Sequence, residues 1–195
     1  MLGYLQDTSQ GRAAPRGIPG LVLLIDNATG QRLQTIRADR TGLYEIALPQ
    51  PSGLGLRVWA RGYALRSEPL RVMPDQVGSE LRKDTALAPL AVGMALALPG
   101  VRFLENSTRL APQSEPVLEQ LVDYLKLNPS LTVRIGARSP RPDADAARVE
   151  ARYRALQVQA FLQARGILAA RLDSGPAPAG SLDDPHGALI TVTAL

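Results

Sequence analysis

The sequence predicts two domains, an all-β sandwich followed by an α/β domain whose elements run in the order β-α-β-α-β. In the first part, apolar residues recur at every second position between turn residues, a pattern typical of short strands. In the second part, two stretches with helical spacing of apolar residues lie between strand-like runs. The chain of 195 residues contains 16 Pro and 17 Gly, which indicates many turns and short elements instead of a bundle of long helices. We place the domains at residues 1–76 and 91–195, joined by a linker at 77–90.

Residues 3 to 74 contain a series of short strand-like runs. The first is the apolar run Leu21 to Ile25, followed by a turn and by the alternating residues of 33–37. Further alternating runs occur at 43–48, which Pro49 ends, and at 54–60. Several short strands at close spacing predict a small β-sandwich.

The turns and aromatic residues of this part carry a family resemblance. Asp39, Gly42 and Tyr44, followed after the next strand by Gly62-Tyr63, stand in a characteristic order. This order resembles that of the carboxypeptidase regulatory-like domain, a transthyretin-type sandwich, over the same stretch. Glycine suits a turn that needs a positive φ, and tyrosine can fill a small core while its hydroxyl still finds a polar partner. We therefore expect these residues to serve the fold and not a ligand.

The linker and the first elements of the second domain follow. Residues 77–90 include polar and charged residues and have no clean period, which indicates a linker or an edge connection. Residues 91–98 predict a strand that continues to Val101 and Phe103, which would share one face. Ser114 is a typical N-cap residue and would start the first helix.

Two helices and two further strands complete the second domain. The first helix has an apolar stripe at helical spacing and stops at Asn128-Pro129. A strand at 131–135 leads into a loop rich in Arg, Ser and Pro. A long helix then runs from about 143 to 165, where Gly166 ends it, and residues 188–195 form the last strand. We expect the long helix to bury the face that carries Ala151, Ala155, Val158 and Leu162.

The order and spacing of several short motifs in this half resemble the OmpA-like C-terminal domain, with which outer-membrane proteins and lipoproteins bind peptidoglycan. The resemblance covers about residues 91–195. The motifs are VRFLENSTRLAP at 101–112, VRIG at 133–136, RALQV at 154–158, Phe161-Leu162 and Arg165-Gly166-Ile167.

The resemblance implies a binding pocket for a peptidoglycan stem peptide. In that family an Asp and an Arg together bind the diaminopimelate residue, whose ammonium and carboxylate suit such a pair. The Arg corresponds to Arg154 here. The Asp position falls on Ser139, and the usual Asn at the helix start falls on Ala147. Half of the expected pair of charges is therefore missing.

The loop before the long helix is basic instead of acidic, and its interpretation stays open. Asp143 or Asp145 could supply the ammonium partner from a shifted position at the helix N-terminus. Alternatively, ligand binding has been lost and the domain serves as a scaffold. Arg138, Arg141 and Arg154 could also converge on one anionic group, or the two loop residues could simply be solvated.

The composition argues against several functional classes. The chain has no Cys and only one histidine, His186, so it lacks the residues for a thiol nucleophile or a histidine-rich metal site, and we expect no cofactor. The formal net charge is +4 and aromatic residues make up 4%, which leaves little for phosphate contacts or base stacking, so we expect no nucleic-acid partner. The acidic pairs of the sequence favour helix starts and turns over acid-base catalysis.

We therefore expect a non-enzymatic structural or interaction protein of the cell envelope with a degenerate OmpA-like domain, part of an outer-membrane-associated assembly. The alternative is a peptidoglycan-binding anchor with an altered pocket. The expected partners are envelope proteins and, in the alternative, peptidoglycan. The first ten residues carry neither a basic region nor an apolar run, and no apolar run of the sequence approaches the length of a membrane span. We therefore expect a periplasmic, outer-membrane-associated chain with no membrane span, whose export signal is absent from this sequence.

Overall fold

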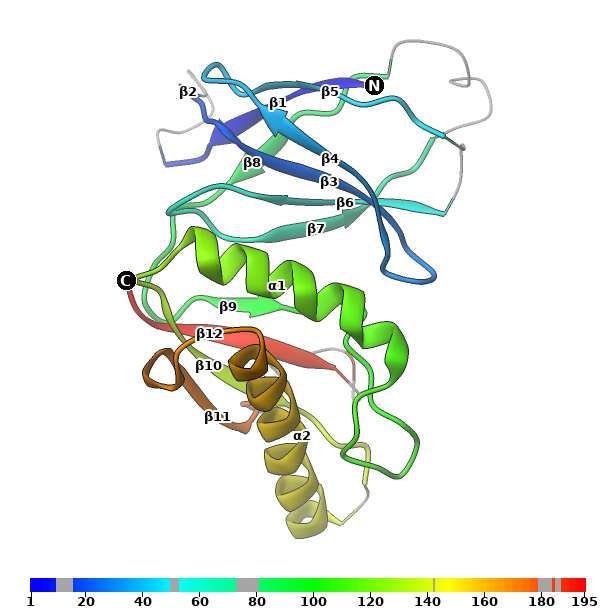
Figure 1. Cartoon of the computed structure of the whole chain (residues 1–195), viewed down its shortest axis with the longest axis vertical. Coiled ribbons are helices and arrows are strands. Elements are labelled where there is room, and N and C mark those ends of the chain that lie inside the picture. The colour runs from blue at the N-terminus through cyan, green and yellow to red at the C-terminus, as the bar shows by residue number, and fades with distance from the viewer. Residues whose placement is uncertain (10–15, 50–52, 73–80, 142, 179–183, 185–186) are drawn as a thin grey trace. The chain divides into compact units, whose positions relative to one another are not determined.

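The computed structural model divides the chain into two compact units, Met1–Leu90 and Ala91–Leu195. It describes all residues except 10–15, 50–52, 73–80, 142, 179–183 and 185–186 (Figure 1). The first unit is built from strands, and both long helices belong to the second unit. Each unit is described separately below.

The first unit contains two four-stranded sheets. In one, β1 is the central strand and pairs antiparallel with β2 and β5 and parallel with β8. These strands span Leu2–Asp7 (β1), Arg16–Gly17 (β2), Leu43–Glu45 (β5) and Thr85–Leu87 (β8). The other sheet is antiparallel in the order β4-β3-β6-β7. Its strands span Gly20–Asp26 (β3), Arg32–Ala38 (β4), Leu54–Trp59 (β6) and Arg66–Pro69 (β7).

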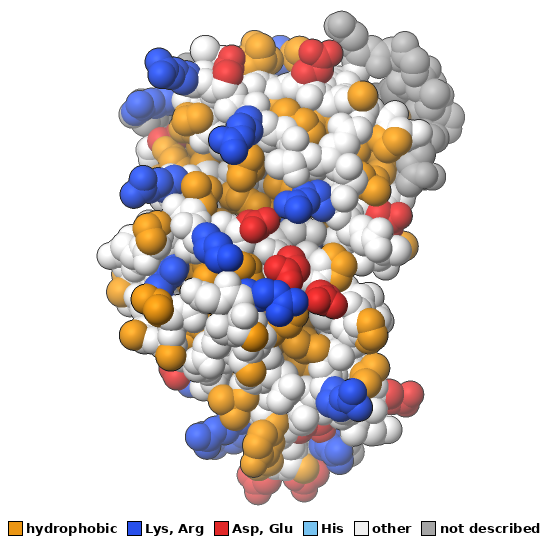
Figure 2. Space-filling model, in the orientation of Figure 1, with side chains coloured by type: hydrophobic (Ala, Val, Ile, Leu, Met, Phe, Trp, Pro, Cys, Tyr) orange, Lys and Arg blue, Asp and Glu red, His pale blue; other side chains and the backbone are white. Residues whose placement is uncertain are grey.

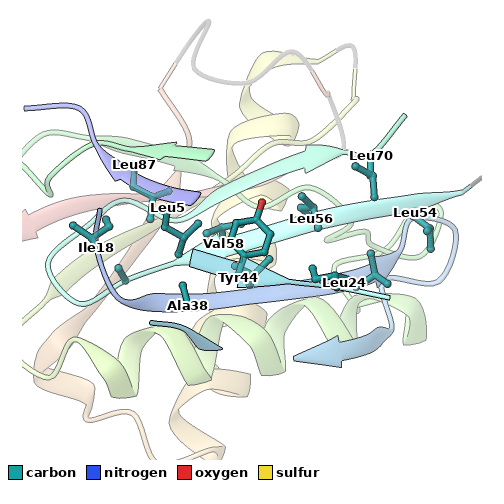
Figure 3. Packing of buried hydrophobic residues seen from close by; sticks show 13 residues of the cluster. Leu5, Ile18, Leu24, Ala38, Tyr44, Leu54, Leu56, Val58, Leu70 and Leu87 are labelled. Atoms are coloured by element: carbon teal, nitrogen blue, oxygen red, sulfur yellow. The ribbon is translucent and has the colours of Figure 1, made fainter. Parts of the chain in front are cut away.

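One apolar cluster joins the two sheets. Leu5 of β1 and Tyr44 of β5 are buried in it with Leu24 of β3 and Val58 of β6. Figure 3 shows Leu5, Tyr44 and Val58 close together within this cluster. The Tyr44 hydroxyl donates a hydrogen bond of 2.5 Å to the carbonyl oxygen of Lys83, so the one polar atom of this buried ring is satisfied.

The turn before β5 depends on a carboxylate and a glycine. Asp39 accepts hydrogen bonds from the backbone N–H groups of Thr41 and Leu43 at 2.8 and 3.0 Å. Gly42 has a φ of +83°, and a Cβ there would lie 2.2 Å from the carbonyl oxygen of Leu5. The positive φ and the short distance to Leu5 exclude a side chain at position 42, and the hydrogen bonds of Asp39 hold the turn. The expected structural role of Asp39 and Gly42 is therefore confirmed.

The described part of the segment 77–90 is an edge connection of the first unit and not a separate linker. Thr85–Leu87 forms β8, which pairs with β1, and Arg82 makes an isolated parallel bridge to Leu2. Tyr63 also bridges to Pro89. The segment has no sequence period because each strand contact is short and is supplied by a partner far away in the chain.

The second unit is a four-stranded sheet with the order β11-β10-β12-β9 and two long helices. The strands span Ala95–Ala97 (β9), Thr132–Ala137 (β10), Leu172–Pro176 (β11) and Ala188–Ala194 (β12), and the helices span Glu115–Leu127 (α1) and Ala144–Ala164 (α2). β10 pairs parallel with β11 and antiparallel with β12. The long helix α2 lies along β10 and β11 (Figure 1). Its predicted buried face is confirmed, because Ala151, Ala155, Val158 and Leu162 are all buried.

The element order is β-α-β-α-β-β, one strand more than predicted. The extra strand is β11. The sequence pattern did not predict this strand because the strand is short and contains Gly175 and Pro176. The first strand is also shorter than expected. It ends at Ala97, and Val101 and Phe103 lie beyond it, both buried, with Phe103 in an isolated bridge to Leu110.

Ser114 precedes α1 but does not cap it with its side chain. Its hydroxyl instead accepts from the backbone N–H of Arg102 and donates to the Arg102 carbonyl oxygen, both at 2.7 Å. The hydroxyl thus fixes the segment after β9 to the helix start. Within the described residues, no helix is both long and apolar enough to cross a membrane.

Candidate functional site

The loop between β10 and α2 carries most of the predicted site residues. Ser139 lies in this loop, and its hydroxyl accepts a hydrogen bond of 3.3 Å from the backbone N–H of Arg141. Asp143 is the N-cap of α2, where its carboxylate accepts from the backbone N–H of Ala146 at 2.7 Å. Asp145 is exposed in the first turn. Both acidic residues therefore sit where negative charge stabilises a helix start.

Arg154 projects from the middle of α2 and is 1% exposed. Its Nε and Nη2 donate to the carbonyl oxygen of Ser107 at 3.2 and 3.1 Å, and its Nη1 donates to the carbonyl oxygen of Arg138 at 3.0 Å. The guanidinium carbon also lies 4.9 Å from the centroid of the Phe103 ring. The cation thus joins the loop after β10 to the segment that precedes α1.

The counter-ion of Arg154 is Glu150, one turn earlier on α2. The Glu150 Oε1 lies 2.7 Å from Nη2 of Arg154, and only 8% of the Glu150 side chain is exposed. The sequence analysis did not select Glu150, although a Glu four residues before an Arg is the usual spacing of a helical ion pair. That spacing is common on solvated helix faces, so by itself it does not single out a buried pair.

Arg141 binds the second oxygen of the same carboxylate through its Nε. Burial alone would raise the pKa of the Glu150 carboxyl, but the hydrogen bond from Arg141 and the positive charges of Arg154 and Arg141 outweigh it, so the pKa lies below its usual value. Burial also lowers the pKa of Arg154 against the opposing effect of Glu150. Glu150 is thus an ionised carboxylate held between two guanidiniums.

Two of the three arginines considered for an anion site therefore do converge, but on a carboxylate of the same chain. Arg138 takes part through its backbone carbonyl, which accepts from Arg154. We call the set of Phe103, Ser107, Arg138, Arg141, Glu150 and Arg154 the Glu150 network.

An open cavity of about 380 Å³ adjoins the Glu150 network. It lies between the segment after Phe103 and the first turns of α2, and Arg141 and Glu150 line it together with Asn106, Ser107, Thr108, Ala146, Val149 and Tyr153. Arg154 and Ser139 are not among the lining residues. His186 lies outside the described residues, and in the part of the chain that is described no group of acidic or histidine side chains could hold a metal ion.

No protein-family model matches this sequence, and no curated protein matches it either. Several solved structures are similar to about half of the chain, among them the following two. One is the peptidoglycan-associated lipoprotein from Burkholderia pseudomallei, with 22% identity and a TM-score of 0.40, covering 48% of this chain and 88% of that chain. The other is a MotB like protein from Desulfovibrio vulgaris, with 19% identity and a TM-score of 0.42, covering 52% of this chain and 73% of that chain. Likeness of this degree does not assign a function, and the carboxypeptidase regulatory-like resemblance has no counterpart among these comparisons.

Proposed function

We propose that the chain is a non-enzymatic structural and interaction protein of the cell envelope, in which the pocket of an OmpA-like domain has become an internal structural network. The observation that carries this proposal is the contact between Glu150 and Arg154. The only residue of the expected diaminopimelate-binding pair that the sequence retains is Arg154, and it is already bound to a carboxylate of its own helix.

The donors of Arg154 support this proposal. A guanidinium has five N–H donors on three nitrogens, and each of the three nitrogens of Arg154 makes a hydrogen bond to a carbonyl oxygen of the chain. A ligand carboxylate would have to displace Glu150 and reach a side chain that is almost fully buried. Displacement would leave the buried Glu150 carboxylate with Arg141 as its one remaining charged partner. The free energy lost in this way would have to be offset by the contacts of the ligand.

The second candidate is a peptidoglycan-binding anchor with an altered pocket. The observation that favours it is the cavity beside the Glu150 network, in which Arg141 is 46% exposed and faces a wall formed by the segment after Phe103. A ligand carboxylate could meet Arg141 there without disturbing Arg154.

A binding measurement with a diaminopimelate-containing stem peptide separates the two candidates. We expect no measurable binding by the wild-type chain. The double substitution Ser139→Asp and Glu150→Leu restores a loop carboxylate and removes the internal competitor of Arg154, so it should create binding. Ser139→Asn with Glu150→Leu is the matched control, because it has no loop carboxylate and should not bind.

Binding by the wild-type chain at micromolar concentration would overturn the scaffold proposal. If that binding is lost in Arg141→Ala, the anchor with an altered pocket is the correct function. If it is lost in Arg154→Ala only, the Glu150 contact opens in solution.

For the first unit we propose a transthyretin-type sandwich of the carboxypeptidase regulatory-like kind. The two sheets around one apolar cluster and the turn at Asp39 and Gly42 support this proposal. We further propose that the protein acts in the periplasm as part of an outer-membrane-associated assembly and binds other envelope proteins.

A further inference from the structure

The solvent-facing side of α2 carries an apolar stripe. Val149, Tyr153 and Leu156 are 56%, 55% and 38% exposed. Their spacing of four and three residues aligns them on one side of the helix, opposite the side that buries Ala151 and Val158. A helix on a protein surface normally presents polar residues on that side, so α2 has a second apolar face that stays largely exposed among the described residues.

Arginines lie along one edge of this stripe. Arg148 and Arg152 are exposed on α2, and within the described residues neither makes a hydrogen bond or an ion pair. They are four residues apart on a helix, a spacing at which like charges repel one another. In the free protein this pair is therefore slightly unfavourable, and a nearby negative charge would relieve it.

The side chains of Arg148 and Arg152 line a pocket of about 360 Å³ between α2 and the edge strand β11. It is lined by Arg134, Arg148, Val149, Arg152, Ser174, Gly175 and Pro176. The carboxylate nearest to Arg134 is Asp173 at 3.7 Å, and both side chains of that pair are more than half exposed. Three guanidiniums thus share a pocket with one loosely held counter-ion. Figure 2 shows basic, acidic and hydrophobic side chains next to one another over the part of the second unit where α2 lies.

We propose that this surface, the stripe Val149, Tyr153 and Leu156 with the pocket of Arg134, Arg148 and Arg152, binds an acidic amphipathic helix of a partner protein. The apolar side chains of that helix would cover the stripe, and its carboxylates would enter the arginine pocket. This inference rests on the proposed function as an interaction protein and names the chemistry of its partner. The stripe extends over two helical turns, which suits anchors spaced at i, i+4 and i+7 on the partner helix.

A second copy of this chain does not fit the same surface. Between residues 151 and 164, α2 contains no Asp or Glu. An antiparallel copy would therefore bring this uncharged or basic half against Arg148 and Arg152, and a parallel copy would bring the arginines against one another. Charge complementarity requires a partner that supplies its own carboxylates.

The test uses the whole 195-residue chain and a labelled helical peptide of about 14 residues, with Leu at i, i+4 and i+7 and Glu beside them. We expect binding in a fluorescence anisotropy titration, weaker by about tenfold or more in the variant Arg148→Ala/Arg152→Ala. Val149→Ser/Tyr153→Ser should weaken it to a similar degree. The control Arg37→Ala/Arg40→Ala removes the same charge from exposed sites of the first unit and should leave the affinity within about twofold.

The outcomes are separable. The proposal is wrong if the Glu peptide does not bind, if a peptide with Gln in place of Glu binds equally well, or if Arg148→Ala/Arg152→Ala binds like the wild type. Binding to vesicles containing an anionic phospholipid, without binding to the peptide, would assign the surface to a membrane instead. Val149 and Tyr153 also line the cavity beside Arg141, so the arginine variant separates this proposal from the proposed function. Arg148 and Arg152 do not line that cavity, and Arg148→Ala/Arg152→Ala should therefore leave the stem-peptide result unchanged.

Discussion

The ion pair between Glu150 and Arg154 makes a quantitative prediction about stability. Replacing Glu150 with Ala leaves the Arg154 guanidinium 1% exposed and without its nearest carboxylate. Loss of one member of a buried ion pair costs about 3–5 kcal/mol. We expect a value near the lower limit, about 3 kcal/mol, because Arg154 keeps its hydrogen bonds to Ser107 and Arg138. For a unit of this size, that loss lowers the Tm by about 12 °C.

A double-mutant cycle isolates the interaction between the two side chains. The variants Glu150→Leu and Arg154→Leu are measured singly and together. The double variant should lose much less than the two single losses added, since the one guanidinium that it leaves without its carboxylate, Arg141, is 46% exposed, and we expect a coupling free energy of about 2 kcal/mol. The structural reason is that Glu150→Leu leaves the buried Arg154 charge without a carboxylate, whereas Arg154→Leu leaves the buried Glu150 carboxylate with Arg141 as its one charged partner.

Arg165 and Glu119 provide a matched control. Their ion pair spans 2.5 Å and Arg165 also stacks on Phe161, but both charged side chains are more than one third exposed. Exposed pairs of this kind typically couple by less than about 1 kcal/mol. Urea denaturation followed by helical circular dichroism reports on the second unit, because α1 and α2 both lie there. Additive losses at Glu150 and Arg154, or a coupling no larger than that of the control pair, would refute the reasoning.

Two further predictions concern the same region. The depressed pKa of Glu150 means that this group contributes stability above its usual pKa of 4.5, which is lost as the pH falls through the lower folded value. The difference in unfolding free energy between the wild type and Glu150→Gln should therefore be largest near neutral pH and shrink in acid, and a difference independent of pH would contradict this. Asp143→Ala should cost about 1 kcal/mol because it removes the N-cap of α2, whereas Asp145→Ala, which removes no such hydrogen bond, should cost less in the same denaturation experiment.

Periodicity predicted the elements whose residues bury one face along their own length. The spacing of Ala151, Ala155 and Val158 was sufficient to orient α2, and the run at 21–25 was sufficient to locate β3. β8 and β11 could not be predicted in this way. Each is at most five residues long, and each exists because a distant strand, β1 or β10, supplies its hydrogen bonds.

The candidate site was predictable only in part, for a related reason. The sequence selected Arg154, Arg141 and Ser139, and the structure places Ser139 and Arg141 in the loop before α2 and Arg154 in the middle of that helix. The role of Glu150 depends on burial by the segment around Ser107, more than forty positions earlier, and on the direction taken by Arg141. Neither can be read from the helical spacing alone.

The position of β12 in its sheet has a consequence for how the second unit forms. β12 lies between β10 and β9, and among the described strands β9 pairs with β12 alone. During synthesis, β9, α1, β10 and α2 leave the ribosome before the strand that links them. The early strand β9 therefore has no partner strand until residues 188–194 have left the ribosome. Folding of this unit is thus necessarily late, and a ribosome that stalls before residue 188 would leave a chain with both helices and no complete sheet to hold them.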